Sequence, residues 1–137
     1  ICRGMQLLNV ALGGSLLQDI SNHRVEPHDA RQESMYHRIY LSPGSKLAAI
    51  VGTGGFFRVN SRHHQGFGEA QKASDLLTSA YSLEDGLIEA IEMPGNRWVI
   101  GVQWHSELED ECPKAFGLLF DALVERAKVN AEKIGRP

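Results

Sequence analysis

A cysteine lies directly before a short apolar helical segment at the start of the chain. Cys2 is followed by Arg3 and Gly4, and residues 3–12 place apolar side chains on one helical face before the Gly13-Gly14 pair. The dipole and free amides at a helix N-terminus stabilise a thiolate, and a small residue such as Gly4 permits the sharp turn that presents a nucleophile. Taken alone, a cysteine in such a position is more often a small core residue.

A histidine and a glutamate two residues apart follow the most strand-like stretch of the chain. Residues 98–104 (Trp-Val-Ile-Gly-Val-Gln-Trp) lead directly to His105, and Glu107 comes next but one. Side chains at i and i+2 of an extended chain point the same way, so Glu107 could bind one imidazole nitrogen while the other faces a nucleophile. With Cys2, this pattern is that of a Cys-His-Glu triad. The alternative is a surface histidine beside the acidic run 107–111, and the pattern alone supports both interpretations equally.

Two adjacent histidines lie in a third polar segment. His63 and His64 belong to residues 60–66, which read Asn-Ser-Arg-His-His-Gln-Gly. Neighbouring side chains of an extended strand point in opposite directions and rarely bind the same ion, and His28 and His37 complete no recognisable ligand spacing. The sequence therefore predicts no metal site, and no motif implies an organic cofactor.

The composition is that of one ordinary soluble domain or part of one. The 137 residues carry 14 basic and 17 acidic side chains, and the net charge of −3 provides no basic surface for nucleic acid or an anionic membrane. No apolar run reaches the ~18 residues that cross a bilayer, and Cys2 and Cys112 are expected to be free thiols, as in a cytoplasmic protein. Because the first residue is Ile1 and not methionine, we expect the chain to be a fragment of a longer protein.

Alternating strands and helices are predicted along the chain. Strands are expected where apolar residues alternate or cluster between turn residues: 36–41, 56–60, 76–82, 87–93 and 98–104. Pro94-Gly95-Asn96 predicts a hairpin, and the polar segment 21–34 predicts a loop. Helices are expected at 3–12, at 46–51 after a Ser45 cap, and from Pro113 onward. The last helix has an apolar stripe formed by Phe116, Leu119, Phe120, Leu123, Val124 and Ala127.

Three segments taken together resemble one protein family. They are Ile1-Cys2-Arg3-Gly4-Met5-Gln6 with the following residues to Leu16, the run from Asn60-Ser61 to His63-His64-Gln65, and Gly101-Val102-Gln103-Trp104-His105 with Glu107. In this order they resemble the class I glutamine amidotransferase superfamily, specifically its gamma-glutamyl hydrolase branch. The resemblance extends over nearly all of the chain, yet it matches only about the second half of the family's domain.

The resemblance implies a hydrolase that forms a thioester. Cys2 would attack the side-chain amide carbon of a gamma-glutamyl group, and His105 would move the proton between the thiol, the leaving amine and water while Glu107 orients it. The backbone amide of Arg3 would supply one half of the oxyanion hole, and a glycine-rich loop upstream of the cysteine the other half. Contacts to the glutamyl group are implied for four residues: Gln6, Ser61, His63 and His64.

The resemblance also implies a fold. It is an α/β three-layer sandwich with a mainly parallel central sheet of the flavodoxin-like type. Residues 1–137 would form the C-terminal part of a single domain that starts at the nucleophile turn. The resemblance implies the missing N-terminal half of the same domain as a partner, because residues 1–137 alone would leave an unpaired edge of the sheet. A second copy of the same protein, in a homodimer, is a further partner to test.

Two alternatives to the hydrolase remain open at this point. The first is a glutaminase domain that passes ammonia to a synthase. The second is a catalytically silent gamma-glutamyl-binding relative, which Ser106 keeps open because the family usually has proline there, with its fixed backbone angle. The leaving amine is also undetermined: gamma-glutamyl-gamma-aminobutyrate of polyamine catabolism, folate polyglutamates and glutathione-like compounds all fit.

Overall fold

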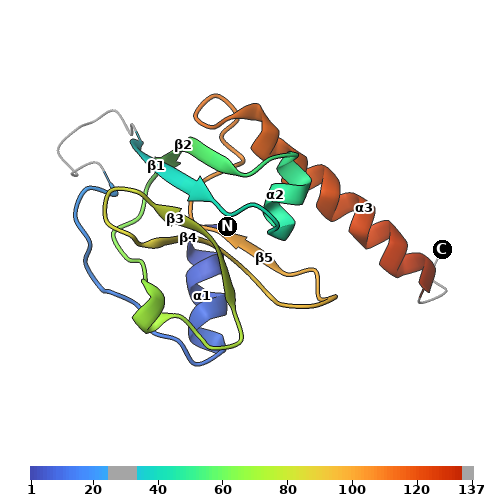
Figure 1. Ribbon diagram of the computed structural model, residues 1–137, viewed down its shortest axis with the longest axis horizontal. Coiled ribbons are helices and arrows are strands. Elements are labelled where there is room, and N and C mark those ends of the chain that lie inside the picture. The colour runs from blue at the N-terminus through green and yellow to red at the C-terminus, as the bar shows by residue number, and fades with distance from the viewer. Residues whose placement is uncertain (25–33, 134–137) are drawn as a thin grey trace.

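A five-stranded sheet with helices on both faces forms the centre of the molecule (Figure 1). The computed structural model describes residues 1–24 and 34–133, so most of the predicted loop 21–34, with His28, lies outside the described residues. The elements in chain order are α1 (Arg3–Ala11), β1 (Met35–Leu41), α2 (Lys46–Val51), β2 (Gly55–Ser61), a 3-10 turn (Glu69–Gln71), β3 (Leu77–Ser82), β4 (Ile88–Glu92), β5 (Ile100–Val102), a 3-10 turn (Lys114–Gly117) and α3 (Leu118–Lys133).

The strands are all paired antiparallel, in the order β2-β1-β3-β4-β5. The expectation of a mainly parallel sheet is therefore wrong for the strands that the structure describes. For β3, β4 and β5 the physical reason lies in the connections, because a parallel pair needs a crossover of about a dozen or more residues. The links 83–87 between β3 and β4 and 93–99 between β4 and β5 are shorter than that, and the second contains the predicted Pro94-Gly95-Asn96 turn.

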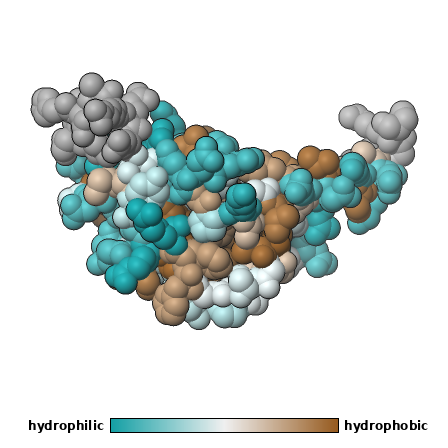
Figure 2. Space-filling model, turned by 90° about the horizontal axis from the view of Figure 1, so that it is seen from above, coloured by the Kyte–Doolittle hydropathy of each residue, from teal (hydrophilic) through white to brown (hydrophobic). Residues whose placement is uncertain are grey.

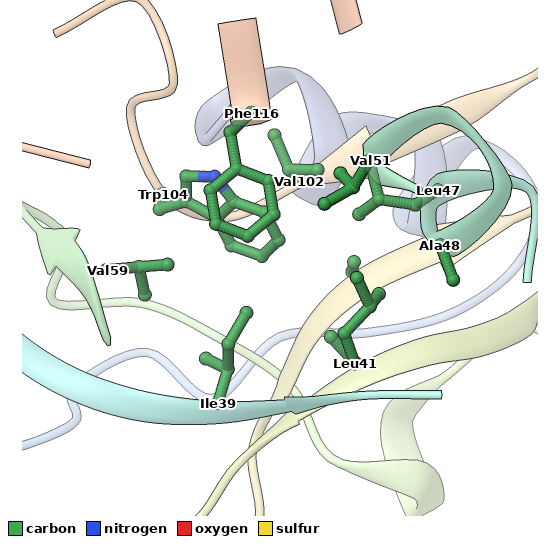
Figure 3. Close-up of a cluster of buried hydrophobic side chains, with 11 residues drawn as sticks. Ile39, Leu41, Leu47, Ala48, Val51, Val59, Val102, Trp104 and Phe116 are labelled. Atoms are coloured by element: carbon green, nitrogen blue, oxygen red, sulfur yellow. The ribbon is translucent and has the colours of Figure 1, made fainter. Parts of the chain in front are cut away.

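Two separate apolar clusters, one on each face of the sheet, give the three layers of the predicted sandwich. On one face, α2 and the start of the C-terminal helical region pack on the sheet, and Trp104 and Phe116 stack at the centre of this cluster (Figure 3) with ring centroids 4.9 Å apart. On the other face, Met5 of α1 packs with Phe67, Leu76 and other apolar residues. The α/β sandwich is confirmed, with α1 on one side of the sheet and α2 and α3 on the other (Figure 1).

The contact between α1 and β5 is close because of one glycine. A Cβ atom at Gly101 of β5 would lie 3.1 Å from the Met5 side chain of α1 and from Ile91 of β4. Such distances are tighter than ordinary packing allows, so glycine lets the helix approach the strand. In addition, the backbone N–H of Cys2 donates to the carbonyl of Val102 at 2.8 Å. The N-terminus of α1 is thereby fixed beside the C-terminal end of β5.

The C-terminal helix differs most from its prediction. Pro113 precedes a 3-10 turn, and α3 then extends away from the body, so that none of its residues is buried (Figures 1 and 2). Of the predicted stripe, Phe116 is buried and Leu119 packs partly on the core, whereas the rest of the stripe is exposed: Phe120, Leu123, Val124 and Ala127. The predicted apolar stripe therefore reaches the core of the described residues only at its first two members. Within 1–24 and 34–133, no helix is both long and apolar enough to traverse a bilayer.

Candidate active site

Cys2 occupies a strained position at the start of α1. It is the N-cap residue, with φ 47° and ψ −106°, in a region that residues with a Cβ atom rarely adopt. Strained turns of this kind between a strand and a helix expose a nucleophile at the helix N-terminus, as in a nucleophile elbow. The position fits the sharp turn expected from the sequence, where Gly4 follows two residues later.

The Cys2 thiol is half-buried and hydrogen-bonded. Burial is the largest influence on it and raises the pKa of Cys2, while the backbone N–H of Arg3 and the side chain of Gln103 act in the opposite direction. Gln103 Nε2 lies 3.4 Å from the sulfur. The net effect is a raised pKa, so the thiol holds its proton at neutral pH and needs a base to become a nucleophile.

His105 and Glu107 form the contact expected from their spacing. His105 Nδ1 lies 2.5 Å from Glu107 Oε1, which leaves Nε2 of the ring free of that carboxylate. Burial alone would raise the pKa of Glu107, but the hydrogen bond to His105 outweighs it and lowers the pKa, so Glu107 remains a carboxylate. The Glu107 charge also acts on the Cys2 thiol. His105 lies three residues beyond Val102, the residue to which the Cys2 backbone is bonded.

Asn60 holds the backbone of His105 from both sides. Its Oδ1 accepts from the His105 N–H at 2.8 Å, and its Nδ2 donates to the His105 carbonyl at 3.1 Å and to Glu111 Oε2 at 3.0 Å. Asn60 is fully buried at the end of β2. It is a positioning residue that the sequence analysis noted only as part of a motif, because its partner lies 45 residues away.

Replacing Asn60 with alanine should lower the free energy of unfolding by about 1–3 kcal/mol, because the His105 backbone groups lose their buried partners. Urea unfolding followed by circular dichroism measures this change. Asn130→Ala, at an exposed position of α3, is the matched control and should change stability by less than about 0.5 kcal/mol. An Asn60→Ala protein as stable as the parent would show that the hydrogen bonds from Asn60 to the His105 backbone contribute nothing to stability.

A chain of two glutamines connects the cavity wall to the thiol. Gln6 Nε2 donates to the Gln65 carbonyl at 2.8 Å and to Gln103 Oε1 at 3.1 Å, which leaves Gln103 Nε2 to face the Cys2 sulfur. Gln6 was expected at the site, but Gln103 was not. Its position two residues before His105 on an extended segment was the signal that could have identified it, because i and i+2 share a face.

Replacing Gln103 with leucine should slow alkylation of Cys2 by iodoacetamide at mildly alkaline pH by roughly fivefold to tenfold. The substitution removes a donor that stabilises the thiolate, so the pKa of Cys2 rises further and less thiolate is present at a given pH. Peptide mass spectrometry measures the rate at Cys2, and Cys112 in the same sample serves as an internal control. Unchanged alkylation at Cys2 would rule out a role for the Gln103 hydrogen bond.

A cavity of about 380 Å³ opens beside Cys2. Its wall includes Arg3 and Gln6 from α1 and the segment from Arg62 to Gln65. The described residues that line it include two arginines and two histidines but no aspartate or glutamate. The size is that of a small-molecule site, and the two arginines favour an anionic ligand.

The remaining sequence-predicted residues lie at different depths. His64 and His63 both line the cavity, although His63 is only 5% exposed. Ser61 is completely buried, does not line the cavity, and donates its hydroxyl proton to the His23 carbonyl at 2.6 Å. Direct contact of all four predicted residues with a glutamyl group stays a prediction, and the structure connects Ser61 to the cavity wall through His23.

Behind the cavity lies a buried group that we call the histidine cluster: His23, His37, His63 and Glu89. Burial is the largest influence on His63 and His37. It lowers the pKa of His63, whereas at His37 it is outweighed by the hydrogen bond and charge of Glu89, which raise the pKa. Nitrogen atoms of His23 and His63 and an oxygen of Glu89 lie within 4.8 Å of one another. These three residues, unlike the adjacent pair His63-His64, have the geometry to hold a metal ion.

Comparisons with known proteins identify the family of the chain. The family model for peptidase C26 matches residues 1–107. Protein NtpR of Enterococcus hirae is 37% identical over 131 residues, which cover 91% of this chain and 53% of that protein. The gamma-glutamyl-gamma-aminobutyrate hydrolase PuuD of Escherichia coli (strain K12) is 33% identical over 132 residues, 90% of this chain and 51% of that protein.

A solved structure shares the fold. The crystal structure of a glutamine amidotransferase from Thermotoga maritima superposes with a TM-score of 0.59 at 18% identity, over 98% of this chain and 47% of that one. The chain spans about half the length of the curated relatives that it matches. The match over residues 1–107 shows that the chain belongs to the peptidase C26 family, among the class I glutamine amidotransferase-like proteins.

Proposed function

We propose that the protein is a cysteine hydrolase of gamma-glutamyl amide bonds, with Cys2 as the nucleophile, His105 as the general base and acid, and Glu107 as the residue that orients His105. The observation that carries the proposal is the strained Cys2 at the N-terminus of α1, beside a cavity lined by cationic side chains. The contact between His105 and Glu107 supports the choice of base. The similarity to PuuD, named a gamma-glutamyl-gamma-aminobutyrate hydrolase, supports the substrate class.

In the first half-reaction, the thiol proton moves to His105 Nε2 as the Cys2 sulfur bonds to the side-chain carbonyl carbon of the glutamyl group. Proton transfer during attack avoids a free thiolate, which the raised pKa of Cys2 disfavours. The carbonyl oxygen takes up the negative charge, and we assign the Arg3 backbone N–H as one of its donors. The C–N bond then breaks, the amine leaves with the proton from His105, and a glutamyl thioester remains.

In the second half-reaction, a water molecule attacks the thioester carbon. His105 accepts the water proton, and the negative charge returns to the carbonyl oxygen within reach of the same N–H donor. When the C–S bond breaks, glutamate is released and His105 returns the proton to the Cys2 sulfur. The cycle consumes one water molecule and needs no oxidant, reductant or organic cofactor.

The cavity supports recognition of the alpha-carboxylate of a glutamyl group. Arg3 and Arg62 contribute guanidinium groups to its wall, and this side chain is well suited to paired hydrogen bonds with a carboxylate. Arg62 is itself held by Glu111, with Nη2 and Oε1 2.7 Å apart. Gln6, His63 and His64 are the further residues that we assign to the glutamyl contact, with Ser61 supporting the wall through His23.

We further propose that residues 1–137 form the C-terminal part of one class I amidotransferase-like domain, completed by an N-terminal part. The relatives are about twice as long as the matched segment. Large apolar side chains are exposed on both helical layers: Leu7 is 67% exposed and Val10 45% on α1, and Leu123 and Val124 are each 53% exposed on α3. These exposed side chains are available for contact with the N-terminal part.

The experiment uses the natural full-length protein. Its substrates are gamma-glutamyl-gamma-aminobutyrate, a gamma-glutamyl peptide and glutamine, and the reagent is a diazo-ketone analogue of glutamine. We expect glutamate release from the gamma-glutamyl compounds and a single adduct on the peptide that contains Cys2. The Cys112→Ala protein should take up the same single adduct.

The other outcomes distinguish the alternatives. Ammonia release from glutamine that requires an added synthase would favour a glutaminase domain. Binding of gamma-glutamyl compounds without turnover would favour a catalytically silent relative. An adduct at any residue other than Cys2, or none, would contradict the proposed nucleophile.

A further inference from the structure

The histidine cluster lies behind the substrate cavity and takes no part in the proposed reaction. Its members come from four segments: His23 from the segment after α1, His37 from β1, His63 from the segment after β2, and Glu89 from β4. None is more than 6% exposed, and the His23 ring lies 4.7 Å, between centroids, from each of the other two rings. Buried polar groups this close require partners for their donors and acceptors.

The ring of His63 presents an acceptor to the cluster. Its Nδ1 lies 2.8 Å from the Gln65 carbonyl, which accepts and never donates, so Nδ1 carries the proton. In the neutral ring Nε2 then has a lone pair, and it faces Glu89 Oε1 at 3.7 Å. Neither of these atoms has a hydrogen-bond partner among residues 1–24 and 34–133.

The ring of His23 presents a second acceptor. Its Nε2 lies 2.7 Å from Asp85 Oδ2, so Nε2 carries the proton, and in the neutral ring Nδ1 then has the lone pair. The nearest group to Nδ1 is the Ser61 hydroxyl at 3.2 Å, but that hydroxyl donates its proton to the His23 carbonyl. Glu89 Oε1 lies 4.0 Å from Nδ1. Two imidazole lone pairs and one carboxylate oxygen therefore converge on one another.

Three converging acceptors repel one another unless a positive species lies among them. Two imidazole nitrogens and one carboxylate oxygen form a ligand set that zinc uses, whereas magnesium and calcium prefer oxygen alone. Zinc ligands at about 2.0–2.2 Å from the ion lie about 3.4 Å apart in a tetrahedron, and the three atoms here lie within 4.8 Å of one another. A contraction of at most about 1.4 Å between any two of these atoms would bring them to the spacing of zinc ligands.

The surroundings of the three atoms also fit a metal site. Histidine ligands usually donate their second N–H to a carboxylate or a backbone carbonyl, which is how His23 contacts Asp85 and His63 contacts Gln65. The other oxygen of Glu89 lies 3.2 Å from His37 Nε2. Together, Glu89 and Asp85 supply two negative charges to balance a divalent cation.

We propose that His23 Nδ1, His63 Nε2 and Glu89 Oε1 bind one zinc ion, which fixes the cavity wall. The ion would join the segment after α1 to the segment after β2, which already contact each other through the N–H of His63 and the carbonyl of His23 at 3.1 Å. Because His63 and Gln65 line the cavity, the ion acts on substrate binding and not on the reacting carbon.

The test uses the natural full-length protein with Cys2→Ala, so that the thiol cannot bind metal. Metal-free protein is titrated with Co²⁺ and followed by visible absorption. We expect the intense bands of a tetrahedral nitrogen and oxygen site, saturating at one ion per chain, displacement by Zn²⁺, and a zinc-dependent rise in melting temperature. Because this protein is inactive by design, the result is independent of the proposed reaction.

Variants locate the ion. Glu89→Gln keeps the side-chain shape and should weaken Co²⁺ affinity at least about 100-fold, and His64→Gln, which changes the neighbouring histidine outside the cluster, should bind Co²⁺ like the parent. Absence of tetrahedral Co²⁺ bands would overturn the proposal in favour of a shared proton or water, even if Glu89→Gln failed to fold. Equal Co²⁺ binding by a folded Glu89→Gln protein would also overturn it, because the ion would then lie elsewhere.

Discussion

Replacing Cys2 with alanine should reduce glutamate release from a gamma-glutamyl substrate by at least about 1,000-fold. The proposed reaction passes through a bond to the Cys2 sulfur, and alanine offers no atom to form it. Substrate affinity should change little, because the cationic groups of the cavity wall remain. Glutamate release and equilibrium binding of the substrate, measured on the same full-length preparation, test both parts of the prediction.

In that experiment, a loss of activity caused by unfolding must be distinguished from a loss caused by the missing sulfur atom. Cys2 is strained at φ 47°, so alanine keeps the unfavourable backbone angle and should leave stability nearly unchanged. Thermal unfolding of the variant provides the control. Residual turnover near the parent rate in a folded Cys2→Ala protein would contradict the proposed mechanism.

Replacing His105 with asparagine should slow turnover by about 1,000-fold or more, because the burial-raised pKa of Cys2 leaves almost no thiolate without a base. Asparagine retains a polar side chain but cannot accept and return the proton. The rate should recover partly as pH rises, since the Cys2 thiol then ionises by itself. Steady-state rates across a pH series, with substrate affinity measured in parallel, report this change.

The contact between His105 and Glu107 leads to a second prediction, in which a smaller loss of rate is expected and a control variant is available. Glu107→Gln removes the carboxylate that lies 2.5 Å from the imidazole and should cost between about 10- and 1,000-fold in rate. Glu109→Gln changes another exposed glutamate of the same loop and should retain the parent rate. If Glu109→Gln and Glu107→Gln behaved alike, the specific pairing with His105 would be excluded.

Local patterns predicted most of the elements. The Ser45 cap and the following apolar residues predicted α2 at its observed bounds, 46–51, because capping and helical periodicity are local properties. The strands were placed to within a few residues for the same reason. The direction of pairing was not predictable in this way, since the parallel sheet came from a resemblance to whole domains, whereas the described strands pair antiparallel and β3, β4 and β5 are joined by short links. The exposure of α3 likewise depends on what packs against it, which periodicity does not reveal.

The site was predictable where residues are close in sequence or part of a known motif. The spacing of His105 and Glu107 predicted their contact, and the position of Cys2 before a helix predicted its strained turn. Asn60 and Gln103 were missed as positioning groups because their roles arise from contacts over 45 and 101 residues. The histidine cluster was missed for the same reason, since its members come from segments far apart in the sequence.

Trapping the covalent intermediate tests the central claim most directly. The full-length protein is quenched with acid during turnover of gamma-glutamyl-gamma-aminobutyrate, digested, and analysed by peptide mass spectrometry at low pH, where thioesters survive. The account predicts one glutamyl group on the peptide that contains Cys2, and its loss on mild treatment with hydroxylamine. An unmodified Cys2 peptide during sustained turnover, or a glutamyl group on another residue, would contradict it.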